Sequence, residues 1–176
     1  MRRTATGLYV VAAAVVMDTP DKASAAAKEV LLPRQSRFHW RDESDRQRYR
    51  MLDCMLAAEL AVYGYIRRSV PARGQERARA LCLRRLLWDL QDAKVGEVVL
   101  ESRHAADRRD RQTIVRAQKA GVAATGLKYR HAFPDSEPPL WLADAAAGAI
   151  AAHAAEENAA YLDRLGPCSQ VIEVEP

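Results

Sequence analysis

Uninterrupted apolar runs and apolar stripes at helical spacing follow one another along the chain. Residues 8–16, LYVVAAAVV, are apolar throughout and partly β-branched, which is typical of a strand buried on both faces. Residues 75–93 place Ala78, Leu86 and Leu90 on one helical face and arginines on the other. Because strands and helices alternate in this way, the pattern predicts an α/β domain with helices packed on a mostly parallel or mixed sheet.

The rest of the chain continues this alternation. Thr19-Pro20 and Ser44 mark helix starts, since Pro is tolerated in a first turn and Ser accepts a hydrogen bond from it. No repeat or linker interrupts the pattern, so we expect one domain over residues 1–176, with its core at about 7–165 and a tail of no predicted role at 166–176. Further strands are predicted at residues 60–70, 95–102 and 127–133, an extended piece at 37–40, and helices at 19–32, 41–60, 103–120 and 139–165.

The first apolar run has a second interpretation. Arg2 and Arg3 precede it, as basic residues precede the apolar part of a signal peptide. Asp18 and Asp21 follow it closely, which is unusual before a cleavage site, and the run is too short to span a bilayer. We therefore favour a buried strand, and a small secreted protein remains the weaker alternative.

Composition narrows the class of protein only moderately. A hydrophobic fraction of 49% and a charged fraction of 28% are those of a folded globular chain. The net charge is +4, and 22 of the 27 basic residues are arginine, which suits bidentate phosphate contacts. A GC-rich coding bias explains the abundance of Arg and Ala equally well. The three cysteines are far apart, so a disulfide framework or zinc site is not expected and a reducing cytoplasm fits best.

Candidate chemistry rests on a few carboxylates and histidines. The chain contains no Gly-x-Gly-x-x-Gly, P-loop, His-Glu-x-x-His or Gly-x-Ser-x-Gly motif. Glu101 ends the predicted strand VVLES, and the carboxyl end of a strand in an α/β sheet opens onto the crevice where ligands bind. A carboxylate there can hold a metal ion, although Glu101 could equally begin a solvated loop.

Asp144 is the unexpected residue of the last helix, in PLWLADAAAGAI. Its helical neighbours include Trp141, Ala147 and Gly148, so the carboxylate is expected to lie along the buried stripe. A buried carboxylate is costly unless it is paired, protonated or bound to a cation. The alternative is a carboxylate favoured by the helix dipole, which weakens beyond the first turn.

Two further groups are ambiguous. His39 lies between Phe38 and Trp40 and is followed by Asp42 and Glu43, a cluster that could line a site, although a histidine flanked by aromatic residues is more often structural. In the helix at 103–120, acidic and basic residues are interleaved. This pattern favours a solvated, salt-bridged face over a phosphate-facing patch. The acidic residues are Asp107 and Asp110, and the basic ones are Arg103, Arg108, Arg109 and Arg111.

Four segments, LYVVAAAVV, RFHWRDES, VVLESR and PPLWLADAAAGAI, together resemble a bacterial family of uncharacterised domains with a ribonuclease H-like fold. Members of that family open on a strand ending Asp-Glu-Ser, continue into a second apolar strand and close with a helix carrying Leu-x-x-Ala-Asp. The closing motif corresponds to Leu140–Asp144 here, and the short Leu-His-Phe-like segment to Phe38–Trp40. The resemblance covers residues 7–155.

The resemblance implies a ribonuclease H-like mixed sheet with helices on both faces, and two divalent cations, Mg²⁺ or Mn²⁺, held between carboxylates. Such cations clamp the attacking and leaving oxygens of a phosphodiester. Asp144 would be the last-helix ligand and Glu101 the central strand-end ligand, with Asp42 or Glu43 as a further candidate. Arg103, Arg108 and Arg109 would steer phosphates.

The sequence departs from the family pattern at its start. The Asp-Glu-Ser strand is missing, and Met1-Arg2-Arg3 looks like the loop just after it. Either the start codon is assigned too far downstream or the protein lacks the first strand. The expected function is a divalent-metal-dependent nuclease, a hydrolase of nucleic-acid phosphodiesters, inactive if the strand is truly lost. The alternative is a non-catalytic accessory module that binds nucleic acid or protein. Neither function requires a membrane.

Overall fold

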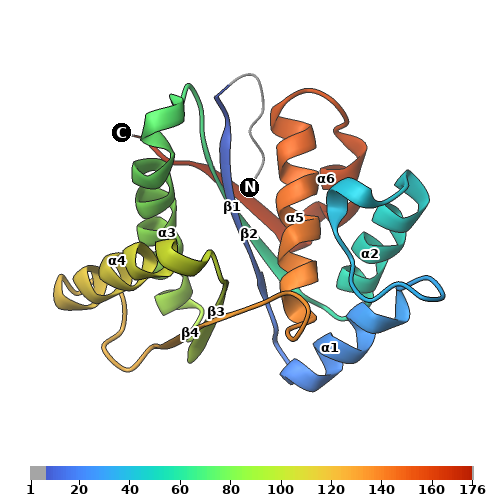
Figure 1. Cartoon of the computed structure of the whole chain (residues 1–176), viewed down its shortest axis with the longest axis horizontal. Coiled ribbons are helices and arrows are strands. Elements are labelled where there is room, and N and C mark those ends of the chain that lie inside the picture. The colour runs from blue at the N-terminus through green and yellow to red at the C-terminus, as the bar shows by residue number, and fades with distance from the viewer. Residues whose placement is uncertain (1–6, 176) are drawn as a thin grey trace.

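The computed structural model describes residues 7–175 and shows an α/β protein with helices on both sides of a mixed sheet (Figure 1). The expected start of the chain at Met1-Arg2-Arg3 lies outside the described residues. The strands are β1 (Tyr9–Val15), β2 (Ala61–Arg67), β3 (Glu97–Glu101), β4 (Lys128–Ala132) and β5 (Ser169–Glu173). The helices are α1 (Pro20–Glu29), α2 (Asp45–Ala57), α3 (Gln75–Asp92), α4 (Asp107–Lys119), α5 (Pro139–Ala154) and α6 (Ala160–Leu165).

The strands form two separate sheets. In the larger sheet β2 is central: it pairs antiparallel with β1 and parallel with β5. Gly64 lies opposite Ala12 on one side and Val171 on the other. The smaller sheet consists of β3 and β4, which are parallel. The predicted α/β class and mixed sheet are therefore confirmed, but β3 does not join the larger sheet.

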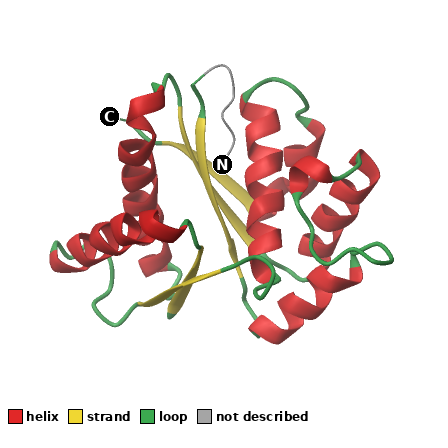
Figure 2. Ribbon diagram, in the orientation of Figure 1, coloured by secondary structure: helices red, strands yellow, loops and turns green. Residues whose placement is uncertain are grey.

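Two hydrophobic cores flank the larger sheet because its strands are apolar on both faces. One core lies between the sheet and α1, α2, α5 and α6; the other lies between the sheet, α3, α4 and the smaller sheet (Figure 2). Adjacent residues of β1 contribute to opposite cores: Tyr9 packs in the second and Val10 against the first. This alternation follows from the side-chain period of two in a strand.

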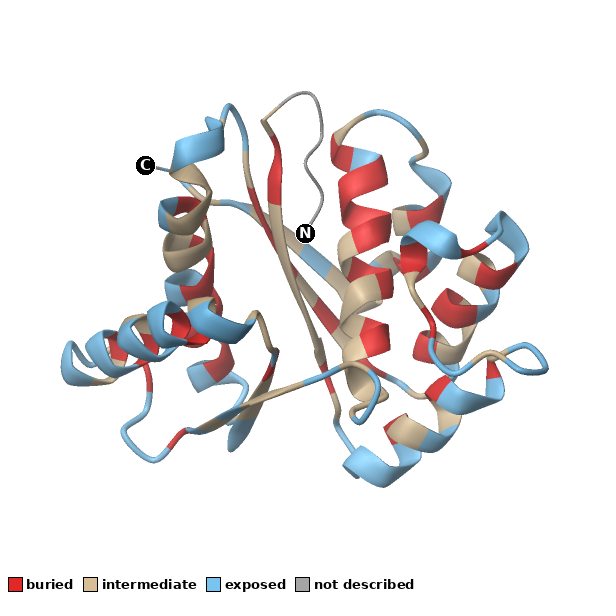
Figure 3. Cartoon of the chain, viewed as in Figure 1, coloured by how far each residue is buried: buried red, intermediate tan, exposed pale blue. Residues whose placement is uncertain are grey.

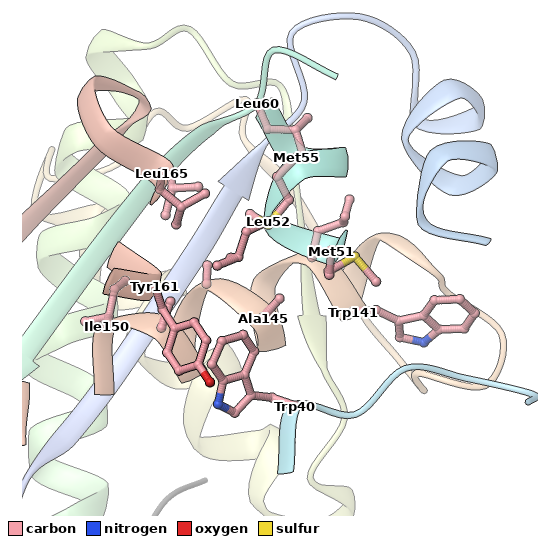
Figure 4. Packing of buried hydrophobic residues seen from close by; sticks show 14 of the residues in the cluster. Trp40, Met51, Leu52, Met55, Leu60, Trp141, Ala145, Ile150, Tyr161 and Leu165 are labelled. Carbon is pink, nitrogen blue, oxygen red and sulfur yellow. The ribbon is translucent and has the colours of Figure 1, made fainter. Parts of the chain in front are cut away.

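Trp40 anchors the first core. Its indole ring packs edge-to-face against Tyr161, with ring centroids 4.9 Å apart, and the Arg48 guanidinium lies 5.1 Å from the Trp40 ring centroid. Figure 4 shows these aromatic rings in the same cluster of buried side chains as Met51 and Leu52 of α2. The cap predictions are confirmed: Thr19 Oγ1 accepts the Lys22 N–H and Ser44 Oγ accepts the Gln47 N–H. None of the helices in residues 7–175 is both long and apolar enough to cross a membrane.

Three sequence-based expectations were wrong. The helix predicted over 139–165 is broken into α5 and α6, and Glu156 between them has a positive φ of 58° that ends the first helix. The tail is not without a role, because it forms β5 and covers the edge of β2. β1 is a strand as predicted, but it lies at the edge of its sheet and its five middle residues are only half-buried (Figure 3).

Gly148 permits the close packing of α5 on Trp40. A Cβ atom at this position would lie 2.3 Å from the Trp40 ring. The ring is fully buried among the side chains of the first core, so it cannot move aside without disturbing them.

We expect Gly148→Ala to lower the free energy of unfolding by about 1–3 kcal/mol, the usual cost of overpacking a core. Helix propensity alone predicts the opposite sign, since Ala stabilises a helix interior by up to about 1 kcal/mol relative to Gly. Urea denaturation measures the difference. Gly126→Ala is the control, because no atom of the described residues lies within 4 Å of a Cβ placed there. A Gly148→Ala protein as stable as the parent contradicts this packing argument.

Candidate functional site

A cavity of about 780 Å³ lies between β1, β3, α3 and α5, and it contains both leading site residues, Asp144 and Glu101. Consecutive residues of β1 and of β3 form two of its walls. The other walls are apolar side chains of α3, such as Leu86, and small residues of α5, such as Ala147. Two carboxylates that are 43 positions apart in the chain, 101 against 144, therefore line the same cavity.

Asp144 is less buried than its apolar neighbours suggested. Its side chain is 37% exposed, which corrects the expectation of a carboxylate on a buried stripe. Asp144 Oδ2 accepts the backbone N–H of Trp40 at 2.9 Å and lies 3.5 Å from His39 Nδ1. One physical reason for an aspartate here is therefore structural: the carboxylate fastens the segment before α2 to α5.

Glu101 closes β3 and is exposed. The next residue, Ser102, still donates its backbone N–H to Ala132 O, so the strand pairing holds the backbone at this position. Glu101 has no ion pair among the described residues, unlike the other acid of the strand, Glu97, whose carboxylate lies 3.3 Å from Arg130 Nε. Arg130 also pairs with Glu137 at 2.7 Å.

The remaining predicted site residues divide into those at the cavity and those elsewhere. His39 lines the cavity, and its Nδ1 accepts the Arg41 N–H at 3.3 Å. Glu43 does not line it; its buried carboxylate accepts a hydrogen bond from the Gln35 side chain. Arg103 lines the cavity but is already engaged by acidic residues, so its guanidinium is not presented to a phosphate.

Five carboxylates line the cavity, and three of them, Asp18, Glu97 and Glu137, are ion-paired with a Lys or Arg side chain. Glu101 and Asp144 are the two that remain available to a cation. Among residues 7–175 no group of three or more His, Cys, Asp or Glu side chains is placed to hold a metal ion. Mg²⁺ prefers oxygen donors, retains several waters and is commonly held by one or two carboxylates together with substrate phosphates. Glu101 and Asp144 are chemically suited to that mode of binding, in which the nucleic acid supplies the other ligands.

A network of buried charges borders the same cavity. Arg79 of α3 donates to both carboxylate oxygens of Asp110, each at 2.8 Å, and Arg103 Nη2 donates to Asp110 Oδ1 at 3.0 Å. Arg103 also donates to Glu76 at 2.8 Å. His131 of β4 completes the group, with Nε2 at 3.6 Å from Asp110 Oδ2. These contacts connect α3, α4 and the smaller sheet.

Burial and pairing act in opposite directions on Asp110. Its side chain is 3% exposed, and burial alone would raise the pKa of the carboxyl. The hydrogen bonds and charge of Arg79 outweigh that effect and hold the pKa below its usual range. The pKa of Asp107 is also lowered, against the effect of burial, by the Arg103 backbone N–H and the Ser102 hydroxyl. Both side chains are therefore carboxylates at neutral pH.

This network was missed in the sequence. Asp107 and Asp110 were interpreted as part of a solvated, salt-bridged face, but both are buried. A signal was present: Asp107, Asp110, Ile114 and Ala117 follow helical spacing, so the two acids share the apolar face of α4. The interleaved arginines obscure this pattern along the linear sequence, and the acids separate from the bases only around the helix.

Comparison with known proteins gives no family assignment. The comparisons found no protein-family model, no curated protein and no solved structure that matches the chain. The chemistry of the cavity and of the surface around it therefore carries the functional argument.

We expect Asp110→Asn to lower the free energy of unfolding at pH 7 by about 3 kcal/mol, because two arginines lose their buried counter-charge. Since the folded pKa of Asp110 is depressed, its stabilisation is complete above about pH 4 and is lost as pH falls through the folded value. The difference between variant and parent should therefore shrink in acid. Urea denaturation across this pH range measures it.

Glu97→Gln is the matched control, since it removes a half-exposed ion pair to Arg130 worth about 0–1 kcal/mol. Equal losses in the two variants, or a loss in Asp110→Asn that does not depend on pH, contradict the assigned role of the buried network.

Proposed function

We propose that this domain is a ribonuclease H-like, divalent-metal-dependent nuclease in which Glu101 and Asp144 bind Mg²⁺ or Mn²⁺. The observation that carries the proposal is that a strand-end carboxylate and a helix carboxylate line one cavity. The resemblance of the strand and helix motifs to ribonuclease H-like domains suggests the same two positions. The phosphodiester of a nucleic acid is the matching substrate, because its oxygens complete the coordination of a cation held by few protein ligands.

The two residues have different parts in this proposal. Glu101 is exposed and has no ion pair among the described residues, so it can turn toward a cation without breaking a contact. Asp144 is held by the Trp40 N–H through one oxygen, which fixes its orientation toward the cavity. A bound cation supplies Lewis-acid stabilisation of the charge that develops on the phosphate oxygens. In family members the first strand supplies another carboxylate, so two ligands alone describe an incomplete centre.

Titration with Mn²⁺ followed by calorimetry tests this assignment. We expect Glu101→Gln and Asp144→Asn each to weaken Mn²⁺ binding by about tenfold or more, since each removes one charged ligand at a cost above about 1.4 kcal/mol. Asn at 144 can still accept the Trp40 N–H, and Gln at 101 breaks no described contact, so both variants should remain folded.

Asp163→Asn is the control for these variants, as Asp163 is an exposed carboxylate of α6 that does not line the cavity. If Mn²⁺ affinity in both cavity variants equals that of the parent and of the control, the two carboxylates do not form a metal site and the nuclease proposal fails.

A second candidate function, a nucleic-acid-binding module, is favoured by the outer face of α4. Every exposed charged residue of that helix is basic, because its two acids are buried in the network with Arg79 and Arg103. Such a one-sided surface attracts phosphates and supports binding with or without catalysis. The exposed basic residues are Arg108, Arg109, Arg111, Arg116 and Lys119.

We expect the triple variant Arg108→Gln, Arg111→Gln, Arg116→Gln to bind DNA or RNA more weakly than the parent. Its affinity should also depend less on salt, with the slope of log K against log salt reduced by about 0.9 for each duplex phosphate that is no longer neutralised. Fluorescence anisotropy at several salt concentrations measures both. A triple variant of exposed basic residues elsewhere, Lys28, Arg34 and Arg46, is the control. Equal slopes in the two triple variants contradict this surface as the nucleic-acid interface.

A further inference from the structure

β1 has the composition of an interior strand and the position of an edge strand. Its seven residues, YVVAAAV, carry no charge and no proline. Edge strands are normally protected by charged side chains, proline or bulges, because their free N–H and C=O groups invite pairing with another strand. Uninterrupted apolar strands are typical of sheets in which both faces are covered. In this structure one edge of β1 pairs with β2 and the other faces the cavity.

A second strand edge without a partner among the described residues lies across the same cavity. In residues 7–175 β3 pairs with β4 on one side only, and residues 95–101 line the cavity. β1 and β3 run in opposite directions in Figure 1. A strand placed between them would therefore be parallel to one and antiparallel to the other. β2 already pairs in this mixed way with β5 and β1.

The walls above and below this slot are suited to apolar side chains. On the α3 side the lining residues are Leu83, Leu86 and Leu90. On the α5 side they are mostly small, including Ala143 and Ala147, which leaves room for larger side chains to enter. The charges that β1, β3 and α3 bring to the lining stand before or after their apolar stretches. The other charges on the lining are Arg41, Asp144 and the ion pair of Arg130 with Glu137. The apolar stretches of β1, β3 and α3 are complementary to an uncharged segment with polar ends.

We propose that the slot between β1 and β3 binds one extended polypeptide segment of a partner protein, apolar on both faces, which joins the two sheets into one. The segment needs about five to seven residues, the lengths of β3 and β1. Its backbone would pair with both free edges, and its alternating side chains would fill the two apolar walls. This inference rests on the two strand edges and not on metal binding or nuclease activity, although the segment would occupy part of the cavity that Glu101 and Asp144 line.

A second copy of the folded chain does not fit as the occupant. The slot is closed on one face by α3 and on the other by α5, so the edge of an intact sheet, with its own helices attached, cannot enter it. A single extended segment carries no such layers. The half-buried valines and alanines of β1 would become fully buried with this kind of occupant.

The test uses the full chain and a synthetic peptide of five consecutive valines with polar flanking residues. We expect saturable binding by calorimetry, and slower amide hydrogen exchange in both β1 and β3 when the peptide is present. The control peptide has proline at alternate positions. It lacks the N–H groups that a central strand must donate, so it should not bind.

A variant of the chain tests the location. Ala147 is half-buried on the cavity side of α5, and Ala147→Leu places a larger side chain in the slot. We expect it to weaken peptide binding by about tenfold, a cost within the range for overpacking. Ala160→Leu on the exposed face of α6 should leave binding unchanged.

Several outcomes overturn the proposal. The first is failure of the valine peptide to bind, and the second is equal binding of the proline peptide. The third is slow hydrogen exchange, without any peptide, at the β1 and β3 amides that face the slot. That result would mean that another part of the same chain fills the slot. Self-association that removes peptide binding as concentration rises would identify a second copy as the occupant and would also overturn it.

Discussion

The two apolar faces of β1 are the constraint on which the architecture depends. A strand without a polar face must be covered above and below, so the chain places α5 on one side of it and α3 on the other. The two cores, the position of the cavity and the approach of Glu101 to the same space as Asp144 all follow from these two helices being held apart by one sheet.

Local sequence signals identified most of the elements but not their pairing. Thr19 and Ser44 marked helix starts correctly because capping depends only on residues within one turn. The apolar run of β1 predicted a strand for the same reason, but no local signal reveals which edge of a strand remains unpaired. β5 was missed because its residues alternate weakly and its stability comes from pairing with β2, far away in the chain.

The site shows the same division between local and tertiary information. Glu101 and Asp144 each lie at a recognisable place in an element, and tertiary folding then brings both to the lining of one cavity. The surroundings of the predicted site residues are not visible in the local sequence. Asp144 is tethered to Trp40 rather than buried alone, and Arg103 is neutralised by Glu76 and Asp110 rather than presented to a ligand. Both facts depend on neighbours from distant segments.

The parallel pairing of β5 with β2 also has a consequence for how the protein is made. A ribosome releases residues 61–67 long before residues 169–173, so the central strand waits for its second neighbour until about a hundred further residues have emerged. Pairings between distant segments are slow to form and leave strand edges open meanwhile. During synthesis β2 must remain shielded by the helices already packed on it. The larger sheet is complete only when β5 pairs with β2.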